Sequence, residues 1–448
     1  MKSEVFENPQ NMRLSTRFRL GRIALREGLR VLALPFHLLA FAFRRKALVE
    51  RMTALLQGSP ASREASNPKE RFRKRAGLES PPKRILIAYG EASGEAHALR
   101  LVQTLRESHP NLHIEAFGGS GLAKLGIKVH VNLVDQAVMG IKGVLALLPF
   151  FFRVTGTFLE LLDDSPPDLF IPIDNPGLNL LLAEQCKKRG IPVLYYICPQ
   201  YWAWGPWRLR RFCKAVAGAI SILPFEPPLF ESMGLPTACA GHPLLQNLTA
   251  PLPETERKPN LLLLPGSRSK EIRRNLPGML RVWEAFRNKH PEAGCKILQS
   301  GTKQEVSIRN MLGQCSHPPI LVFGDPSEEL GRARLALVKS GTGSLQTSLQ
   351  GTALVVVYKL GNPLEEWLGK LLLTVPWIAA TNLVLGRKAV PEFCFAGEED
   401  WSKVTEALLT LWEQGSPRKE IKAALGECRQ ALTGPGADHL VREWIGPS

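Results

Sequence analysis

The feature that most constrains the fold is a repeated alternation of strand-length apolar runs with helix-length segments, which begins at Arg84. The runs form two series of five, separated by the Pro-rich segment 251–259. Segments between them, such as 95–108 and 180–189, have helical spacing of apolar residues. This alternation predicts α/β architecture, with parallel sheets covered by helices on both faces. The predicted strands are 84–89, 113–118, 168–174, 193–198, 218–223, 261–265, 295–300, 319–323, 335–339 and 353–359.

The chain of 448 residues is long enough for two domains and an appendage. We expect a basic, partly apolar extension and linker at 1–83 and an N-terminal Rossmann-like domain at 84–255. A C-terminal Rossmann-like domain follows at 256–448, and its last helices are expected to pack back on the N-terminal domain. The two domains are expected to face each other across a cleft.

The N-terminal segment holds most of the net positive charge. Residues 1–84 carry 19 Lys or Arg and 7 acidic residues, which leaves +12 of the net +16. The apolar run 31–43 is too short to span a bilayer and contains Pro35. Basic residues on both sides favour a helix lying on anionic lipid, and the alternative is a helix packed on the protein. Residues 58–83 have the composition of a flexible linker.

A second apolar zone, 141–152, ends in three adjacent phenylalanines. A helix with one core-facing stripe does not bury three consecutive large side chains. A helix buried on two sides is one interpretation, and a surface patch that enters a membrane or contacts acyl chains is the other. The residues assigned to an acceptor or membrane patch are Ser93, Gly94, Ile141, Leu148, Phe150, Phe151 and Phe152.

The eight cysteines show no paired spacing and no Cys/His cluster typical of zinc. We interpret them as free thiols in a reducing compartment rather than as a disulfide framework. A nucleic-acid partner is disfavoured, because the basic N-terminal segment lacks the interleaved aromatic residues of a single-strand binding surface.

Polar residues directly follow several predicted strands. Asp174 comes after the apolar run 169–173, and Glu91 lies in the loop 90–94 after the first strand. In an open α/β sheet, ligands bind at the carboxyl ends of strands. We therefore take both carboxylates as candidate site residues. For Glu91, the alternative is a carboxylate that interacts favourably with the dipole of the following helix.

The second half contains two comparable loops, at 264–268 and 340–344. Each offers backbone N–H groups and a hydroxyl or guanidinium group at a predicted helix start, which suits a diphosphate. Neither loop matches a Walker A motif, and no G-x-G-x-x-G motif occurs in a dinucleotide-binding context. ATP- and NAD-dependent reactions are therefore disfavoured, and the layout is typical of a sugar-nucleotide enzyme.

These segments occur in the order of a known family. Over about residues 84–435, the chain resembles the lipid-A-disaccharide synthases, which are GT-B glycosyltransferases of lipopolysaccharide synthesis in Gram-negative bacteria. The resemblance rests on nine motifs: Gly90-Glu-Ala-Ser-Gly-Glu95, Ala137-Val-Met-Gly-Ile141, Ile173-Asp-Asn-Pro176, Cys198-Pro-Gln-Tyr-Trp-Ala-Trp204, Leu223-Pro-Phe-Glu226, Gly241-His-Pro243, Leu264-Pro-Gly-Ser-Arg268, Ser340-Gly-Thr342 and Asn382-Leu-Val-Leu-Gly386.

The resemblance implies a GT-B fold and an inverting transfer from UDP-2,3-diacylglucosamine to 2,3-diacylglucosamine 1-phosphate. The products would be a β(1→6)-linked disaccharide 1-phosphate and UDP, with no metal or cofactor. Asp174 would be the base, and Glu91 would orient the acceptor or share that role. Arg268 would stabilise the departing UDP. The implied donor-binding residues are Gly266, Ser267, Arg268, Glu271, Ser340, Gly341, Thr342, Gln346 and Asn382.

The resemblance also implies a cytoplasmic enzyme, peripheral on the inner face of the inner membrane and active as a homodimer. Five residues depart from the family pattern. Gly143 and Gly177 replace acidic residues, and Gln346 replaces a glutamate that commonly binds ribose hydroxyls. Glu95 stands where aspartate is usual, and Thr381 where proline is common. Two alternatives stay open, namely a GT-B transferase with another lipid acceptor and a catalytically silent lipid-binding paralogue.

Overall fold

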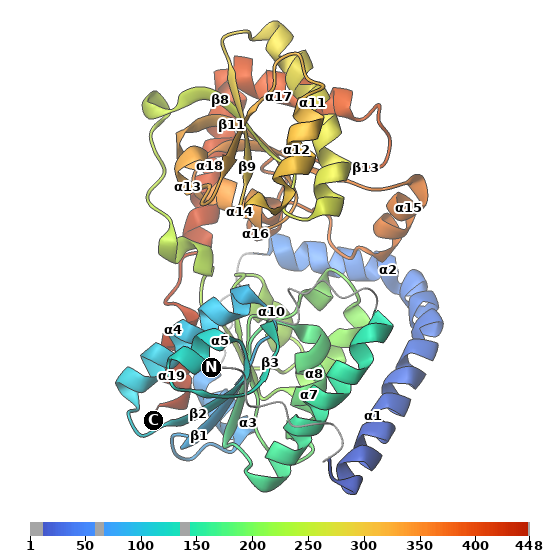
Figure 1. Ribbon diagram of the computed structural model, residues 1–448, viewed down its shortest axis with the longest axis vertical. Helices are drawn as coiled ribbons and strands as arrows, with labels where there is room; N and C mark the ends of the chain where they lie inside the picture. Colours follow the sequence, from blue (N-terminus) through green and yellow to red (C-terminus); the bar gives the residue numbers. More distant parts are fainter. Residues whose placement is uncertain (1–11, 59–66, 135–143, 447–448) are drawn as a thin grey trace. The chain divides into compact units, whose positions relative to one another are not determined.

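The computed structural model describes residues 12–58, 67–134 and 144–446 (Figure 1). The chain divides into two compact units. Unit 1 comprises residues 1–46, 60–241 and 434–448, and unit 2 comprises residues 47–59 and 242–433. The chain therefore enters unit 2 at His242, ahead of the Pro-rich segment 251–259, and returns to unit 1 for its last residues.

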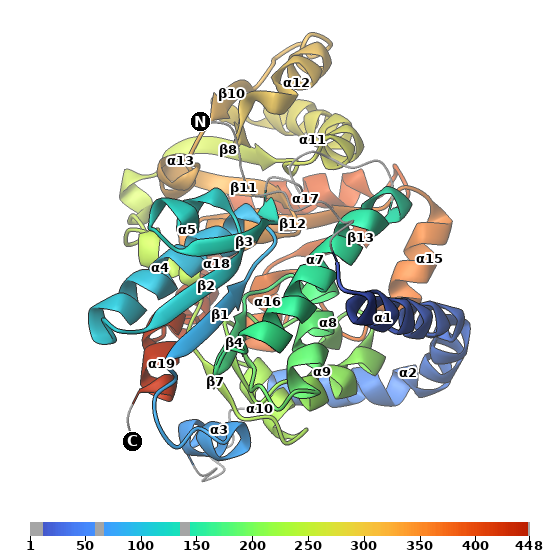
Figure 2. The same ribbon diagram turned by 60° about the horizontal axis from the view of Figure 1, so that its bottom comes forward.

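Unit 1 is built on parallel strands in the order β3-β2-β1-β4, next to a second sheet, β5-β6-β7 (Figure 2). Two parallel bridges, Phe170 to Val193 and Ile173 to Tyr196, connect β4 to β5. The direction of the strand order therefore reverses between β1 and β4. The strands are β1 (Arg84–Ala88), β2 (His113–Gly118), β3 (Lys128–Asn132), β4 (Leu169–Pro172), β5 (Leu194–Tyr196), β6 (Gly218–Ser221) and β7 (Thr237–Cys239).

Helices cover both faces of the unit 1 sheet (Figure 2). On one face, Ile87 of β1 and Leu101 of α4 belong to the same buried core. On the other face, Phe158 of α7 packs against Phe117 and Phe170, with ring centroids 5.4 and 5.2 Å apart. The helices are α3 (Pro68–Ala76), α4 (Ala92–Ser108), α5 (Ser120–Lys124), α7 (Val144–Asp164), α8 (Pro176–Lys187), η2 (Gln200–Trp202), η3 (Pro206–Arg208), α9 (Leu209–Ala215), α10 (Glu226–Glu231) and α19 (Ala437–Ile445).

Unit 2 contains one six-stranded parallel sheet in the order β10-β9-β8-β11-β12-β13. Counted within the unit this is the order 3-2-1-4-5-6, which is typical of Rossmann folds. The central strands are apolar on both faces because helices cover both. The strands are β8 (Lys258–Leu264), β9 (Gly294–Gln299), β10 (Ile320–Phe323), β11 (Ala333–Lys339), β12 (Ala353–Lys359) and β13 (Glu392–Phe395).

The helices of unit 2 alternate with these strands, and the last two long ones follow β13. They are η4 (Pro243–Asn247), η5 (Glu254–Glu256), α11 (Ser269–Lys289), η6 (Thr302–Gln304), α12 (Glu305–Leu312), α13 (Ser327–Arg332), α14 (Thr342–Leu349), α15 (Pro363–Leu372), α16 (Ala380–Leu385), α17 (Trp401–Glu413) and α18 (Gly415–Ala431).

All ten predicted strands are present, and the described part of the chain contains three more that were not predicted. β3, β7 and β13 are short and lie at the edges of their sheets. Three to five residues carry too little periodicity to distinguish a strand from a loop. These strands form because a neighbouring strand supplies their hydrogen bonds.

The extension forms helices rather than a linker. α1 (Leu14–Leu32) and α2 (Leu34–Gln57) meet at Ala33, two residues before Pro35. Residues 59–66 lie outside the described residues, but the prediction of a flexible linker is wrong for α3. This helix begins at the cap residue Asn67, whose Oδ1 accepts from the backbone N–H of Lys69 at 3.0 Å. Phe72 is fully buried in the unit 1 core, and Arg71 donates to Glu231 Oε1 at 2.7 Å, so apolar and charged contacts together order this segment.

Candidate active site

The candidate site residues of unit 1 lie where the direction of the strand order reverses. β1 and β4 pair from Ile85–Leu169 to Ala88–Pro172, so the loops that follow them are neighbours. The loop after β1 carries Glu91, and the loop after β4 carries Asp174. In open α/β sheets, ligands bind in the crevice at such a point. The structure thus brings both predicted carboxylates to one edge of one sheet.

The backbone around Asp174 is strained and held in place. Asp174 and Asn175 both have left-handed conformations, with φ of 48° and 44°. Such conformations cost a non-glycine residue about 1–3 kcal/mol and persist only where the surroundings impose them. The carbonyl oxygen of Asp174 accepts from Asn179 Nδ2 at 2.8 Å and from Tyr195 Oη at 2.6 Å. We call these two donors the carbonyl clamp. By holding the backbone, they fix the position of the Asp174 Cα atom, from which the side chain projects.

The environment of Asp174 favours proton uptake. Partial burial raises the pKa of the Asp174 carboxyl above its ordinary value, and the negative charge of Glu91 raises it further. The backbone N–H of Asn175 opposes both effects in part. A carboxylate with a raised pKa is a stronger proton acceptor, as a general base requires.

The loop after β1 approaches the Asp174 loop closely at Gly90. A Cβ atom at Gly90 would lie 2.0 Å from Nδ2 of Asn175, so a side chain there would displace that amide. Glu91 is exposed and is the last residue before α4. Of the predicted acceptor residues, Ser93 is exposed, whereas Gly94 is buried, and a Cβ there would lie 3.0 Å from Cβ of Tyr89. Gly94 therefore serves helix packing.

The predicted acceptor or membrane patch falls on the first turns of α7. Ile141 lies outside the described residues. Leu148 and Phe152 are 42% and 38% exposed, and Phe150 and Phe151 are half-buried. No residue from 148 to 152 is buried, so the interpretation as a helix buried on two sides is wrong for this part of the zone. Packing leaves these apolar side chains at the surface of the unit.

In unit 2, the candidate loops follow β8 and β11, which pair along residues 261–264 and 335–338. Glu271 joins the two loops. Its carboxylate accepts from the backbone N–H groups of Ser267 and Arg268, at 3.3 and 3.4 Å, and from Lys339 Nζ at 3.1 Å. Burial alone would raise the pKa of Glu271, but these donors and the charge of Lys339 hold it below its ordinary value. Glu271 therefore supports the loops with both carboxylate oxygens.

The other groups of these loops can receive an anion. Arg268 is 82% exposed and lies 3.7 Å from Glu271 Oε1. The Ser340 hydroxyl donates to the carbonyl of Ile378 at 2.8 Å and so fixes its own loop. Gly341 has a φ of 150°, and Thr342 is the exposed first residue of α14. The backbone N–H groups at this helix start and the Arg268 guanidinium offer positive potential at the edge of the sheet.

Two predicted donor-binding residues have other partners in the structure. Gln346 is half-buried on α14, and its Nε2 donates to Ser327 Oγ at 3.3 Å. Asn382 is fully buried, and all its hydrogen-bonding capacity is used within unit 2. It donates to the carbonyl of Val390 and to Glu392, and it accepts from two backbone N–H groups. A hydrogen bond from Asn382 to the sugar-nucleotide donor would require one of these bonds to break. In the structure, Asn382 supports the segment 389–392.

Three residues that were not predicted from the sequence also stabilise or charge the candidate loops. Asn179 forms part of the carbonyl clamp, Lys339 places a cation beside Gly341, and Glu392 accepts from the backbone N–H groups of residues 378 and 379. Burial raises the pKa of Glu392 against these hydrogen bonds. Two of these residues have a sequence signal that could have found them. Lys339 is a lysine at the end of an apolar strand, and Asn179 is an amide on the apolar face of a helix.

Residues 12–58, 67–134 and 144–446 show neither a metal-binding cluster nor a membrane-spanning helix. No group of three or more His, Cys, Asp or Glu side chains there could hold a metal ion. Within the same ranges, no helix is long and apolar enough to cross a membrane. All eight cysteines are free thiols. Unit 1 thus carries two candidate carboxylates at one sheet edge, and unit 2, taken by itself, carries two loops that can receive an anion.

Solved structures share this architecture. A UDP-GlcNAc 2-epimerase from Neisseria meningitidis bound to UDP-GlcNAc matches with a TM-score of 0.52 at 10% identity, covering 81% of this chain and 99% of that one. The S. aureus MnaA structure with UDP also has a TM-score of 0.52 at 10% identity, covering 82% and 99%. The fold is therefore α/β of the GT-B class, with two Rossmann-like units and a helical N-terminal extension.

Sequence comparison identifies the family. The model of the family described as Lipid-A-disaccharide synthetase matches residues 85–435. The lipid-A-disaccharide synthase of Myxococcus xanthus is 34% identical over 369 residues, covering 80% of this chain and 96% of that protein. The synthase of Syntrophus aciditrophicus is 34% identical over 365 residues, covering 79% and 95%. The chain belongs to the lipid-A-disaccharide synthetase family and is a glycosyltransferase of lipid A synthesis, which confirms the resemblance. Residues 1–84 lie outside the family match.

Proposed function

We propose that the chain joins UDP-2,3-diacylglucosamine to 2,3-diacylglucosamine 1-phosphate, with Asp174 as the base. The observation that carries the proposal is the Asp174 carboxylate. It lies at the point where strand order reverses, its backbone is fixed by the carbonyl clamp, and its pKa is raised by burial and by Glu91. Family membership supports the choice of lipid-linked sugars as substrates.

In the proposed step, the 6-hydroxyl oxygen of the acceptor attacks C1 of the donor sugar, while Asp174 takes the hydroxyl proton. The bond from C1 to the diphosphate oxygen breaks, and UDP leaves with the electron pair. Attack from the side opposite UDP inverts C1 and forms the β(1→6) linkage. Glu91, exposed beside Asp174, orients the acceptor and keeps the pKa of the base raised.

On the donor side, the proposed diphosphate site is the pair of loops in unit 2. Charge develops on the leaving diphosphate, and fixed donors aimed at it lower the barrier. Arg268 supplies an exposed cation, and Lys339 adds a second positive charge beside Gly341. Gly266, Gly341 and Thr342 are proposed to offer backbone N–H groups, and Ser267 and Thr342 to offer hydroxyls. Ser340 would hold the loop, because its N–H and hydroxyl donate to the carbonyls of Val357 and Ile378. Gln346 is proposed to bind the ribose hydroxyls, without the charge assistance of a carboxylate.

We further propose that unit 1 binds the acceptor and unit 2 the donor, and that the enzyme acts as a homodimer at the inner face of the inner membrane. Both substrates carry acyl chains, so they reside in a bilayer. The apolar side chains at 148–152 are suited to contact those chains, because they stay at the surface.

The test is a transfer assay in detergent with both substrates, in which mass spectrometry detects the disaccharide 1-phosphate. Asp174→Asn should lower kcat by about 10²–10⁴-fold, the usual contribution of a general base. Asp400→Asn is the matched control, since that carboxylate pairs only locally with Lys403 among the contacts described. Wild-type activity in Asp174→Asn would refute the assignment of the base.

The same assay separates the alternative functions. Release of UDP with another lipid acceptor, but without this one, would indicate a GT-B transferase of different specificity. Absence of UDP release with every acceptor and acyl length, from folded protein that still binds the lipids, would indicate a silent lipid-binding paralogue.

A further inference from the structure

The extension helix α1 lies along α7 (Figures 1 and 2), and its buried residues Thr16, Leu20 and Ile23 share one face. Leu20 and Ile23 of α1 form a small buried cluster with Leu159 of α7. On the same side, Arg19 pairs with Asp163 at 2.6 Å. The inward face of α1 is therefore fastened by apolar contacts and by charge.

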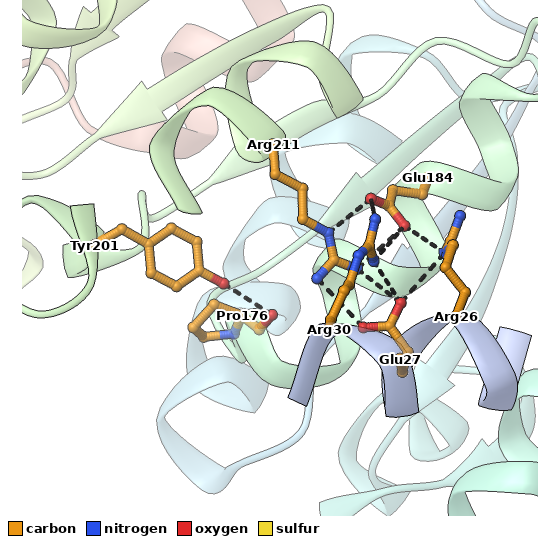
Figure 3. Close-up of polar contacts among 7 residues, drawn as sticks. All are labelled: Arg26, Glu27, Arg30, Pro176, Glu184, Tyr201 and Arg211. Carbon is orange, nitrogen blue, oxygen red and sulfur yellow. Dashed lines mark hydrogen bonds and ion pairs between the residues drawn. The ribbon is translucent and has the colours of Figure 1, made fainter. Parts of the chain in front are cut away.

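A cluster of five charged side chains fastens the C-terminal half of α1 (Figure 3). Glu184 of α8 accepts from Arg26 at 2.6 Å and from Arg30 at 3.2 Å, both on α1. Arg211 of α9 donates to Glu184 at 2.6 Å and to Glu27 of α1 at 3.2 Å. Three helices of unit 1 share this network, so α1 has a defined rotation about its own axis.

With that rotation set, a second apolar stripe on α1 faces away from the body of unit 1. Its members recur at helical spacing, three, four or seven residues apart, and so share one side of the helix. Each is between 56% and 72% exposed. They are Leu14, Phe18, Leu25, Leu29 and Leu32.

The first half of α2 repeats the pattern. Phe41 is buried, with its ring 5.7 Å from that of Trp207. Phe36, Leu39 and Phe43 lie on another side of the helix and are 76%, 59% and 83% exposed. A soluble surface rarely exposes so many large apolar side chains in one short segment, and such patches mark sites of interaction.

The charge of the residues beside these apolar stripes indicates which kind of partner can bind there. Residues 14–46 contain eight Arg or Lys and one Glu, a net charge of +7. Arg19, Arg26 and Arg30 pair with carboxylates of unit 1 on the inward side, so the other basic residues charge the outward face. Arg22, Arg44 and Lys46 are exposed and flank the apolar stripes. Two copies of this surface would repel each other, so self-association through it is disfavoured. An apolar stripe bordered by basic side chains matches the boundary between acyl chains and anionic headgroups.

We propose that α1 and residues 34–46 of α2 form a docking face for the surface of an anionic lipid bilayer. The helices lie along the surface, the exposed leucines and phenylalanines enter the acyl boundary, and the flanking Arg and Lys contact headgroup phosphates. Because the ion cluster fixes α1, docking also orients unit 1. The face belongs to residues outside the family match at 85–435, and its function does not depend on the proposed reaction.

The test is flotation of the full chain with vesicles of phosphatidylcholine, with and without phosphatidylglycerol. Wild type should float with the anionic vesicles, and less so at high salt. Phe18→Ser/Leu25→Ser/Leu29→Ser should lower the partition coefficient by at least about 100-fold, because three large apolar side chains no longer enter the lipid. The matched control is Val306→Ser/Ile320→Ser, two exposed apolar residues of unit 2 that should leave flotation unchanged.

A second variant tests the charges and keeps the apolar stripes. Arg22→Gln/Arg44→Gln should weaken binding to anionic vesicles by about 30-fold, at about fivefold for each cation lost. Circular dichroism confirms that each variant is folded, and light scattering reports its oligomeric state. Equal flotation of wild type and the serine variant, or no flotation of wild type, would overturn the proposal. A loss of oligomers in the serine variant with unchanged flotation would assign the face to a second copy instead.

Discussion

Replacement of Asn179 by alanine tests whether the carbonyl clamp positions the base. Asn179 is fully buried, and its Nδ2 lies 2.8 Å from the carbonyl oxygen of Asp174, 3.2 Å from that of Ile173 and 3.3 Å from that of Ala88. Two N–H groups serve these acceptors, so the substitution removes two hydrogen bonds of about 1 kcal/mol each. The unfolding free energy should fall by about 2–3 kcal/mol, including a small cavity.

The effect on catalysis follows from the backbone strain at Asp174 and Asn175. Their left-handed conformations cost about 1–3 kcal/mol each, and this cost favours relaxation once a restraint is lost. If the clamp contributes about 2 kcal/mol to the active conformation, kcat should fall about 30-fold in Asn179→Ala. Tyr195→Phe removes the other donor to the same carbonyl, so the double variant should show a coupling energy of at least about 0.5 kcal/mol.

The measurements are urea unfolding followed by circular dichroism, and kcat in the transfer assay. Gln185→Ala is the matched control, because Gln185 is a buried polar residue of the same helix that lies away from the loop. It should leave kcat unchanged. Wild-type kcat in a destabilised Asn179→Ala variant would refute the positioning role, and unchanged stability would refute the hydrogen bonds themselves.

Three further predictions concern packing and charge. Gly90→Ala should lower kcat about 10–100-fold, because its Cβ displaces the amide next to the base, whereas Gly177→Ala, with nothing within 4 Å, should be neutral in the same assay. Glu91→Gln removes a charge that raises the pKa of Asp174, so the acidic limb of kcat/KM against pH should move to lower pH. Burial raises the pKa of Glu226 from 4.5 to about 8, so its stabilising contribution is complete below pH 4.5 and is lost as pH rises to about 8. In Glu226→Gln, the unfolding free energy measured with urea should depend less on pH between 4.5 and about 8. An unchanged pH dependence would contradict the interpretation that Glu226 is buried as a neutral acid.

Much of the fold was predictable because it depends on local patterns. Apolar runs of strand length and helical spacing between them mark the ten main strands, and Asp174 and Glu91 follow two of these runs directly. Parallel strands place their carboxyl ends at one edge of a sheet, so the edge that carries these residues follows from the sequence alone.

The roles of individual polar residues were less predictable. Glu271 and Asn382 have the positions of donor-binding residues in the sequence, but their polar atoms serve neighbouring loops. Lys339 and Asn179 are recognised as supporting residues only from their hydrogen bonds to Glu271 and Asp174, which the order of the strands brings near them. A side chain's hydrogen-bond partners are set by packing, which the periodicity of one segment does not contain.

In the N-terminal extension, too, some features follow from the sequence and others only from packing. The sequence by itself determined that the apolar run 31–43 lies between basic residues and favours a helix on a surface, because composition and charge are local properties. Only the tertiary structure decided that Leu20 and Ile23 turn inward while Phe18 and Leu25 turn outward. That choice depends on α7 and on Glu184, which lie more than 100 residues away in sequence and supply the opposing apolar surface and charge.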